Sequence, residues 1–421
     1  MKIIHFSDLH IGYARYSKGI DLETGLDNRI IDFLNTFDEL VDYALQENVD
    51  LVIFAGDAYK DRNPSQTHQR EFAKRLLKLT KENIPIALVV GNHDMPGNKG
   101  RATALDIFPT LNLDNITLID KLKLYELNTK SGTPIQILGM PWIRKGSLIS
   151  RLSNIKKDIT IEDLNKQIIQ TLDNSLEIEL SNINKSIPCI FSGHLTVMEA
   201  KTSTETLMSI GADYMFPAQF FARPEFEYVA LGHVHKDQVL IESPPVIYSG
   251  SLERVDFGEK DDVKGFYVIE IEPKNSQGNR LIKYQKIPVS ARNFREYIIN
   301  IPKDTKFPVN IIEKELNSNE IKDSIARITI ESTREHYESI NDPKIQSILS
   351  KAKYLVSTEL KLISEKKIND IQITENLGII DSFEKYLENF KEIDDQKRKR
   401  LLEFGKNIVN EYENENENEN E

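Results

Sequence analysis

The chain has 421 residues, of which 39% are hydrophobic and 29% are charged, proportions typical of a globular protein with more than one domain. Its net charge of −12 argues against a generally basic nucleic-acid-binding protein, although six of the acidic residues lie in the terminal segment 411–421. No apolar run is as long as a membrane span, Met1 leads directly into a strand-like segment rather than a signal peptide, and the single cysteine excludes an internal disulfide, so we expect a cytoplasmic protein.

The N-terminal part of the chain alternates strand-like and helix-like segments. Ile3–Ser7, Leu51–Ala55 and Leu88–Val90 are short, continuously apolar runs, typical of strands that are buried on both faces. Between them, Ile30–Leu45 carries an apolar stripe at helical spacing, and a second helix is predicted to start at Asn63–Ser65. This β-α-β-α-β order predicts a parallel sheet with right-handed crossovers.

Further strands and one long helix are predicted before residue 288. The helix spans about Ser150 to Leu180. The strands are predicted at Ile135–Gly139, Ile187–Ser192, Tyr228–Leu231, Val246–Ser249, Gly265–Ile271 and Leu281–Ile287. These are enough strands for two stacked sheets with helices on the outer faces.

The character of the sequence changes near Pro288–Arg292. Beyond it we predict a small α/β unit, then two short helices with apolar faces, and then an alternating Glu-Asn tail of low complexity. The strands of the unit are predicted at Tyr297–Ile301, Ile325–Ile330 and Tyr354–Leu362, its helices at Asn310–Leu316 and Lys344–Ala352, and the two C-terminal helices at Asp381–Phe390 and Asp394–Asn410.

Five of the predicted strands end in Asp, Asn or His. The motifs are Asp8-Leu9-His10, Gly56-Asp57, Gly91-Asn92-His93-Asp94, Gly193-His194 and Gly232-His233-Val234-His235, and they hold five of the eight histidines. Taken alone, a Gly-Asp after a strand is usually a turn, and a lone histidine is usually structural. Together, at the carboxyl ends of strands, where chemistry collects in open α/β sheets, they predict a metal site.

In this order, the motifs resemble those of the calcineurin-like metallophosphoesterases, and the spacing and the rest of the chain resemble the SbcD-type DNA exonucleases, the nuclease subunits of SbcCD complexes. The resemblance implies a four-layer α/β/β/α sandwich with a small α/β cap domain and C-terminal helices. It places a nuclease domain at 1–288, the cap at 289–375, a helical segment that docks an ATPase partner at 376–412, and a disordered acidic tail at 413–421.

The resemblance also implies two divalent metal ions and assigns their ligands. Asp57 would bridge both ions, since a carboxylate offers one oxygen to each. Asp8, His10 and His235 would complete one site, and Asn92, His194 and His233 the other. The donors are nitrogen and oxygen without thiolate, which favours Mn²⁺ and leaves Fe, Zn and Mg²⁺ open.

His93 lies beside a ligand but outside the ligand set. We expect it to orient the phosphate and to protonate the leaving oxygen, with Asp61 or Asp94 as candidates for orienting its ring. The alternative is a structural histidine behind the metal ligands.

DNA is expected to contact loops near the strand ends, where three basic clusters lie. A charge on a loop is usually only solvated, so the prediction depends on the clusters as a group. They are Arg15, Tyr16 and Lys18; Lys60 and Arg62; and Lys99 and Arg101.

No phosphate-binding nucleotide loop is visible in the chain, so any ATP dependence must come from a partner. The resemblance implies an SbcC-type coiled-coil ATPase as that partner, and a homodimer within a heterotetramer. The alternative for the C-terminal helices is a hairpin packed on its own cap. The expected function is a DNA exonuclease and endonuclease of double-strand break repair. The alternatives are a small-molecule or cyclic-nucleotide phosphodiesterase, a protein phosphatase, which the extra residue in 56–63 disfavours, and a scaffold protein with an inactive site.

Overall fold

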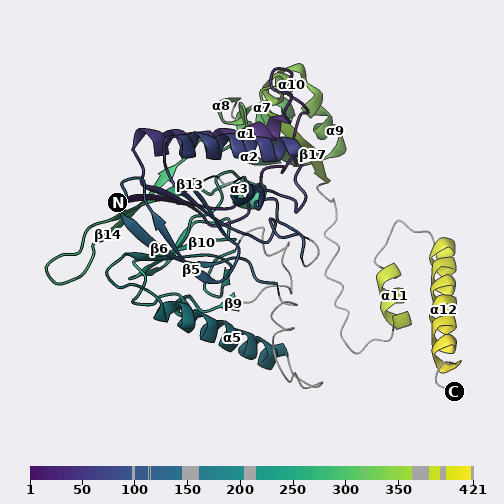
Figure 1. Ribbon diagram of the computed structural model, residues 1–421. Helices are drawn as coiled ribbons and strands as arrows, with labels where there is room; N and C mark the ends of the chain where they lie inside the picture. Colours follow the sequence, from purple (N-terminus) through teal and green to yellow (C-terminus); the bar gives the residue numbers. More distant parts are fainter. Residues whose placement is uncertain are drawn as a thin grey trace.

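Two six-stranded sheets, stacked face to face and covered by helices on both outer faces, make up the larger part of the computed structural model (Figure 1). The structure describes residues 1–96, 100–111, 113, 115–144, 161–202, 215–316, 318–362, 379–388 and 395–418. The predicted four-layer α/β/β/α sandwich is confirmed.

The first sheet has the order β14-β13-β1-β2-β3-β4. Its strands are β1 (Lys2–Phe6), β2 (Leu51–Phe54), β3 (Ile86–Val89), β4 (Ile116–Ile119), β13 (Gly265–Ile271) and β14 (Ile282–Pro288). The first four are parallel, as the β-α-β-α-β order predicts, and β13 runs antiparallel to β1. All residues of β2 and β3 are buried, which accounts for their continuously apolar sequences.

The second sheet has the order β11-β12-β10-β7-β6-β5. Its strands are β5 (Lys123–Asn128), β6 (Pro134–Met140), β7 (Cys189–His194), β10 (Tyr228–Gly232), β11 (Gln238–Glu242) and β12 (Pro245–Tyr248), and β8 (Thr196–Val197) pairs separately with β9 (Met215–Phe216). The sequence reading missed β4, β5 and β11. All three are edge strands that are only partly buried, so their short, mixed sequences lack a continuous apolar run.

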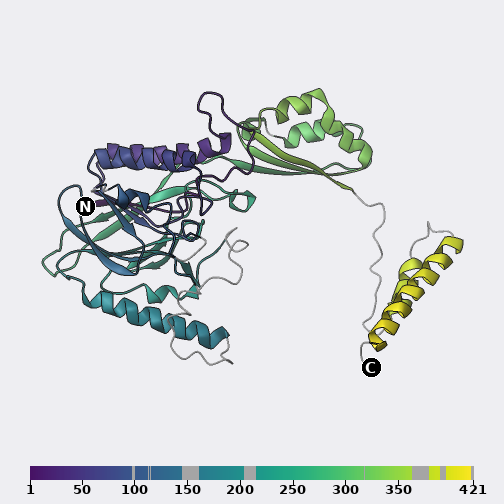
Figure 2. The same ribbon diagram turned by 45° about the vertical axis from the view of Figure 1, so that its right-hand side comes forward.

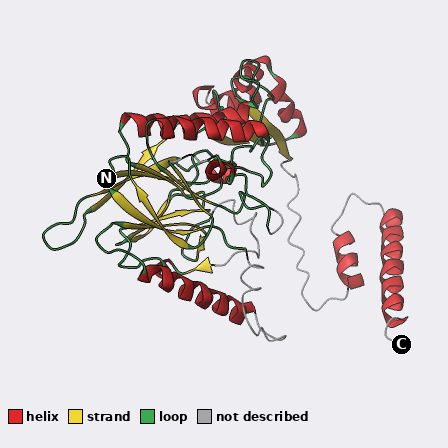
Figure 3. Cartoon of the chain, viewed as in Figure 1, coloured by secondary structure: helices red, strands yellow, loops and turns green. Residues whose placement is uncertain are grey.

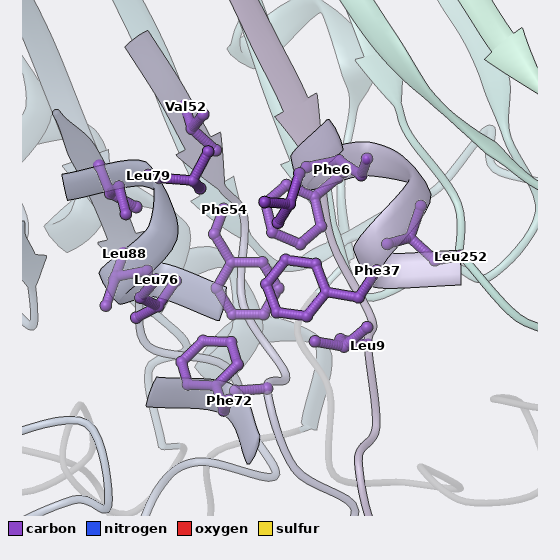
Figure 4. Packing of buried hydrophobic residues seen from close by; sticks show 14 of the residues in the cluster. Phe6, Leu9, Phe37, Val52, Phe54, Phe72, Leu76, Leu79, Leu88 and Leu252 are labelled. Atoms are coloured by element: carbon purple, nitrogen blue, oxygen red, sulfur yellow. The ribbon is translucent and has the colours of Figure 1, made fainter. Parts of the chain in front are cut away.

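Helices α1 (Asn28–Gln46), α2 (Gln66–Lys81) and the short α3 (Ile107–Thr110) lie on the first sheet, and α5 (Ile161–Ser181) lies on the second (Figure 3). Ser65 caps α2 by accepting a hydrogen bond from His68 N–H, which explains why the helix starts there. Phe6 and Phe54 of the sheet pack against Phe37 and Phe72 of the helices (Figure 4). The first part of the predicted helix, residues 150–160, lies outside the described residues.

The mostly apolar layer between the sheets contains a buried polar pair, His5 and Tyr228. His5 donates from Nε2 to the carbonyl oxygen of Leu231 (3.2 Å), and its Nδ1 lies 3.0 Å from the hydroxyl of Tyr228, so the ring is held neutral. Burial lowers the pKa of His5 to about 3.

A second, smaller α/β unit follows the sandwich and contains the predicted strands and helices. Its parallel strands are β15 (Phe294–Asn300), β16 (Ile325–Ser332) and β17 (Tyr354–Leu362), and its helices are α7 (Pro308–Glu315), α8 (Ser318–Ile321), α9 (Arg334–Tyr337) and α10 (Pro343–Leu349). The unit contacts the sandwich through a small aromatic cluster in which Tyr16 packs against Phe257 and Phe294. Arg292 also pairs with Asp32 of α1.

The last described elements, α11 (Ile379–Glu388) and α12 (Asp395–Asn418), lie side by side (Figure 2). Helix α12 continues into the tail that we expected to be disordered from residue 413. The tail contains neither Pro nor Gly, the two residues that most strongly interrupt a helix. Residues 419–421 and the expected boundary at 375 lie outside the described residues, and the domain boundaries stay predictions. None of the described helices is both long enough and apolar enough to span a membrane.

Candidate metal centre

The five polar motifs lie at the carboxyl ends of adjacent strands. Strands β1, β2 and β3 are neighbours in the first sheet, and β7 and β10 are neighbours in the second. The side chains that these strand ends bring together are Asp8, His10, Asp57, Asn92 and His93 from the first sheet and His194, His233 and His235 from the second. The centre therefore spans both sheets.

One group consists of Asp8, His10 and His235, all buried, whose ligand atoms lie within 4.8 Å of one another. Nε2 of His10 lies 2.9 Å from Nε2 of His235 and 3.9 Å from Oδ1 of Asp8. This is the set of residues that the sequence assigned to one metal ion.

The other group consists of Asp57, His194 and His233, with Asn92 beside them. Nε2 of His194 lies 2.9 Å from Oδ1 of Asn92 and 3.3 Å from Oδ2 of Asp57. Nδ1 of His233 lies 3.2 Å from the same oxygen of Asn92. Oδ2 of Asp57 is also 3.8 Å from Nε2 of His10, so this carboxylate lies between the two groups.

The side chains of the centre place several nitrogen and oxygen lone pairs close together, so the centre favours a bound proton or cation. His194 donates from Nδ1 to the carbonyl oxygen of Ala55 (2.7 Å), so in the neutral ring the lone pair is on Nε2, which faces the oxygens of Asn92 and Asp57. Burial alone would lower the pKa of His194, but the charge of Asp57 and its hydrogen bond outweigh burial and raise that pKa to about 9. A divalent cation supplies the same charge, so this nitrogen and oxygen donor set fits a metal ion.

Asp94, a candidate for orienting His93, instead holds two motif loops together. Its carboxylate accepts backbone hydrogen bonds from Asp57 (2.9 Å), Ala58 (3.0 Å) and Gly91 (3.0 Å). Burial and the nearby charge of Asp57 raise the pKa of Asp94 to about 7. The loop after β2 and the loop after β3 are thereby fixed in register, which places Asp57 beside Asn92.

His93 lies at the edge of the centre, half-buried. Its Nδ1 donates to the carbonyl oxygen of Lys60 (2.5 Å), in place of the carboxylates predicted from the sequence, and its backbone N–H donates to Oδ1 of Asp57 (2.9 Å). The ring centre is 4.9 Å from that of His10. In the neutral ring, Nε2 is the nitrogen that accepts a proton.

Two motif loops have residues with positive φ angles, and one glycine packs very closely against a neighbouring loop. Asp57 and His233 have positive φ angles of 65° and 106°, a conformation that is costly outside glycine and is found at functional sites. A Cβ on Gly91 would lie 2.1 Å from Oδ1 of Asp57, so only glycine fits there. The glycine in this motif thus makes room for the carboxylate of Asp57.

Two residues that the sequence reading missed contact the histidines of the centre. The ring of Trp142, after β6, lies 4.9 Å from that of His233 at an interplanar angle of 39°. The carboxylate of Glu259 accepts a hydrogen bond from Nδ1 of His235. Trp142 and Val90 also line a pocket of about 670 Å³ between the centre and α5.

Of the loop residues that were predicted to contact DNA, some are exposed in the structure and others take part in contacts within the chain. Arg15, Lys60, Arg62 and Arg101 are exposed, and Arg101 lines the pocket beside the centre. The ring of Tyr16 is buried in the contact with the smaller unit, and Lys18 donates to the carbonyl oxygen of Ala352 in that unit (3.1 Å), so both take part in a contact within the chain. Lys99 lies outside the described residues.

The sequence profile of the calcineurin-like phosphoesterase family matches residues 1–237, which contain all five motifs. The chain is a calcineurin-like phosphoesterase. Membership of this family implies a metal-dependent phosphoesterase, in agreement with the donor set of the centre.

Among its relatives, this calcineurin-like phosphoesterase is similar to nucleases of DNA repair. It is 27% identical over 321 residues to the DNA double-strand break repair protein Mre11 of Methanocaldococcus jannaschii, covering 75% of this chain and 74% of that protein. It is 29% identical over 301 residues to the SbcD component of the SbcCD nuclease of Staphylococcus epidermidis, covering 71% and 72%. With the SbcD protein of Escherichia coli it is 27% identical over 269 residues, covering 62% of each chain. The resemblance to SbcD-type nucleases is confirmed.

Proposed function

We propose that the chain is a two-metal DNA nuclease, acting as a double-strand exonuclease and a single-strand endonuclease with an SbcC-type ATPase in DNA end processing. The observation that most strongly supports this proposal is the length over which the chain is similar to Mre11. The match to Mre11 covers 75% of this chain, about 316 of its 421 residues, whereas the sandwich that carries the metal centre ends with β14 at residue 288. A small-molecule phosphodiesterase of the same family needs the metal centre alone, so similarity beyond it favours the nuclease.

In this proposal Asp57 would be shared by both ions, which agrees with its position between the two groups of ligands. Asp8, His10 and His235 would hold one ion, and Asn92, His194 and His233 would hold the other. Mn²⁺ is the proposed metal because the donors are imidazole nitrogens and carboxylate or amide oxygens. When bound, two such ions supply the positive charge that attracts a phosphodiester and polarises its phosphorus.

His93 then acts as the general acid. Water attacks the phosphorus and releases a proton to the solvent, the bond from phosphorus to the leaving oxygen breaks, and protonated His93 gives the proton on Nε2 to that oxygen. The carbonyl oxygen of Lys60 supports this role by accepting the Nδ1–H of His93, which fixes the ring and leaves Nε2 for the substrate side.

The proposed DNA-contacting surface consists of the exposed residues Arg15, Lys60, Arg62 and Arg101, together with Lys99. The smaller α/β unit is the proposed cap that shapes this surface, and α11 and α12 are the proposed dock for the coiled-coil ATPase. The side chain of Phe404 on α12 is 66% exposed, which leaves an apolar residue available for a partner. The homodimer within a heterotetramer and the cytoplasmic location stay predictions.

A nuclease assay tests the proposal. The chain, with Mn²⁺, should degrade linear duplex DNA from its ends and cut single strands, with closed circular duplex as the resistant control. Hydrolysis of small phosphodiesters without cleavage of any DNA, with or without the ATPase, would establish the small-molecule alternative instead.

Deleting residues 379–421 tests the docking segment separately. The shortened chain should keep its hydrolysis of small phosphodiesters but no longer co-purify with the coiled-coil ATPase. Unchanged co-purification would remove α11 and α12 from the partner interface.

A further inference from the structure

A buried carboxylate lies directly behind one of the metal-site histidines. Glu259 ends the 3-10 turn η2 (Phe257–Glu259), and its Oε1 accepts a hydrogen bond from Nδ1 of His235 at 2.8 Å. Both side chains are buried. With the proton held on Nδ1, the lone pair of His235 is on Nε2, which faces Asp8 and His10.

Lys264 fixes the other side of this carboxylate. Its Nζ lies 2.8 Å from Oε2 of Glu259 and donates to the backbone carbonyl of His235 at 3.1 Å. A buried lysine is costly unless it is paired, and Glu259 is the nearer of the two carboxylates that pair with Lys264, the other being Asp262 at 3.4 Å.

The turn that carries Glu259 is itself held in place. The ring of Phe257 packs against Phe294 and Tyr16, with ring centres 5.0 Å and 5.7 Å apart, and the guanidinium of Arg327 lies 4.0 Å above it. The backbone N–H of Val255 donates to Oε2 of Glu259 at 3.1 Å. The turn is therefore fixed by the smaller α/β unit on one side and by Lys264 on the other.

We propose that Glu259 is the positioning residue of His235: with Lys264 behind it, it sets the tautomer and the direction in which Nε2 of His235 meets a metal ion. The inference rests on the metal centre of the proposed function. A partner of this kind orients a metal-binding histidine and increases its basicity.

Two histidines of the second sheet, His194 and His235, are positioned differently. Nδ1 of His194 is held by the backbone carbonyl of Ala55, which no substitution removes, whereas His235 depends on a side chain. Loss of Glu259 should therefore weaken the site of Asp8, His10 and His235 and spare the site of His194.

Binding of Mn²⁺ to the full chain, measured by isothermal titration calorimetry, tests this asymmetry. Wild type should bind two ions. The double variant Glu259→Leu, Lys264→Met, which removes both buried charges together, should keep one ion and bind the second about 10 to 100 times more weakly. Glu259→Gln, whose amide oxygen can still accept from Nδ1, should lose less affinity than the double variant.

The matched control is Lys260→Gln, which removes the 2.6 Å ion pair with Glu296 at the end of the same turn and leaves Glu296 paired with Arg327. It should bind both ions with wild-type affinity. A second readout is nitrogen NMR of the metal-free wild type, in which the proton of His235 should be on Nδ1.

Two outcomes would overturn the positioning role: wild-type affinity for both ions in the double variant, or a His235 proton on Nε2 in the wild type. If the double variant does not fold, Glu259→Gln and the NMR measurement decide. If wild type itself does not bind a pair of ions, the proposed metal centre is wrong and this inference falls with it.

Discussion

Replacing Gly91 with alanine would place a methyl carbon 2.1 Å from Oδ1 and 2.5 Å from the backbone nitrogen of Asp57. Non-bonded atoms do not approach so closely, so Asp57 must move by about 1 Å. It has little freedom to do so, because its backbone N–H donates to Asp94 and its Oδ1 accepts the backbone N–H of His93.

The expected result is a large loss of function with a moderate loss of stability. A 1 Å displacement of a ligand between both metal groups should lower activity on a small phosphodiester by about 100-fold and weaken the binding of both Mn²⁺ ions. The overpacking itself should cost about 1–3 kcal/mol in the free energy of unfolding. Hydrolysis of the small phosphodiester measures the loss of activity, and calorimetric titration measures the binding of Mn²⁺. Urea unfolding, followed by the fluorescence of the single tryptophan, Trp142, measures the loss of stability.

The matched control is Gly139→Ala, in strand β6. Its methyl carbon would lie 2.2 Å from a side-chain carbon of Ile119, so it overpacks the same sandwich away from the metal ligands. Both variants should lose comparable stability, and only Gly91→Ala should lose metal. Two ions bound to Gly91→Ala with wild-type affinity would refute the placement of Asp57 at the centre of the site.

Three further substitutions separate the roles of individual residues. His93→Gln should lower kcat by about 10²- to 10⁴-fold while calorimetry still detects two bound ions; loss of an ion would make His93 a ligand. Asn92→Asp adds a negative charge to the centre, so it should keep both ions and raise KM for a phosphodiester by about tenfold, and an unchanged KM at low salt would contradict this. The pKa of His5 is lowered from 6.5 to about 3, so the unfolded chain takes up a proton that the folded chain does not as the pH falls below 6.5. Between pH 8 and pH 5 this should remove about 2 kcal/mol from the free energy of unfolding, and His5→Gln should lack that part of the pH dependence; an equal slope in both proteins would show that His5 is not held neutral.

The residues of the candidate metal centre stand out in the sequence because each is encoded locally. A buried parallel strand has a continuously apolar sequence, and its carboxyl end is where the chain turns. Asp57, Asn92 and His194 therefore stand out at the ends of their own strands. These side chains come together because their strands are neighbours in the two sheets, so no further side-chain contact has to be known to place them near one another.

Residues whose roles depend on distant partners could not be recognised in this way. Tyr16 lies between Arg15 and Lys18, a setting that suits stacking on DNA as well as burial, and only its contact with Phe294 decides for burial. Glu259 lies in a charged stretch, 259–262, that reads as a solvated loop, although its carboxylate is buried behind His235.

The position of β1 inside the first sheet bears on how this protein folds during synthesis. Ile3 pairs with Leu51 of β2 on one side but with Ile269 of β13 on the other, and β13 is made after the last of the five polar motifs. Until then, the growing chain has a central strand with an open row of backbone hydrogen-bonding groups, a state prone to pairing with other chains. Translation must therefore pass residue 271 before the first sheet closes, and a chain terminated earlier lacks the strand that shields its N-terminus from aggregation.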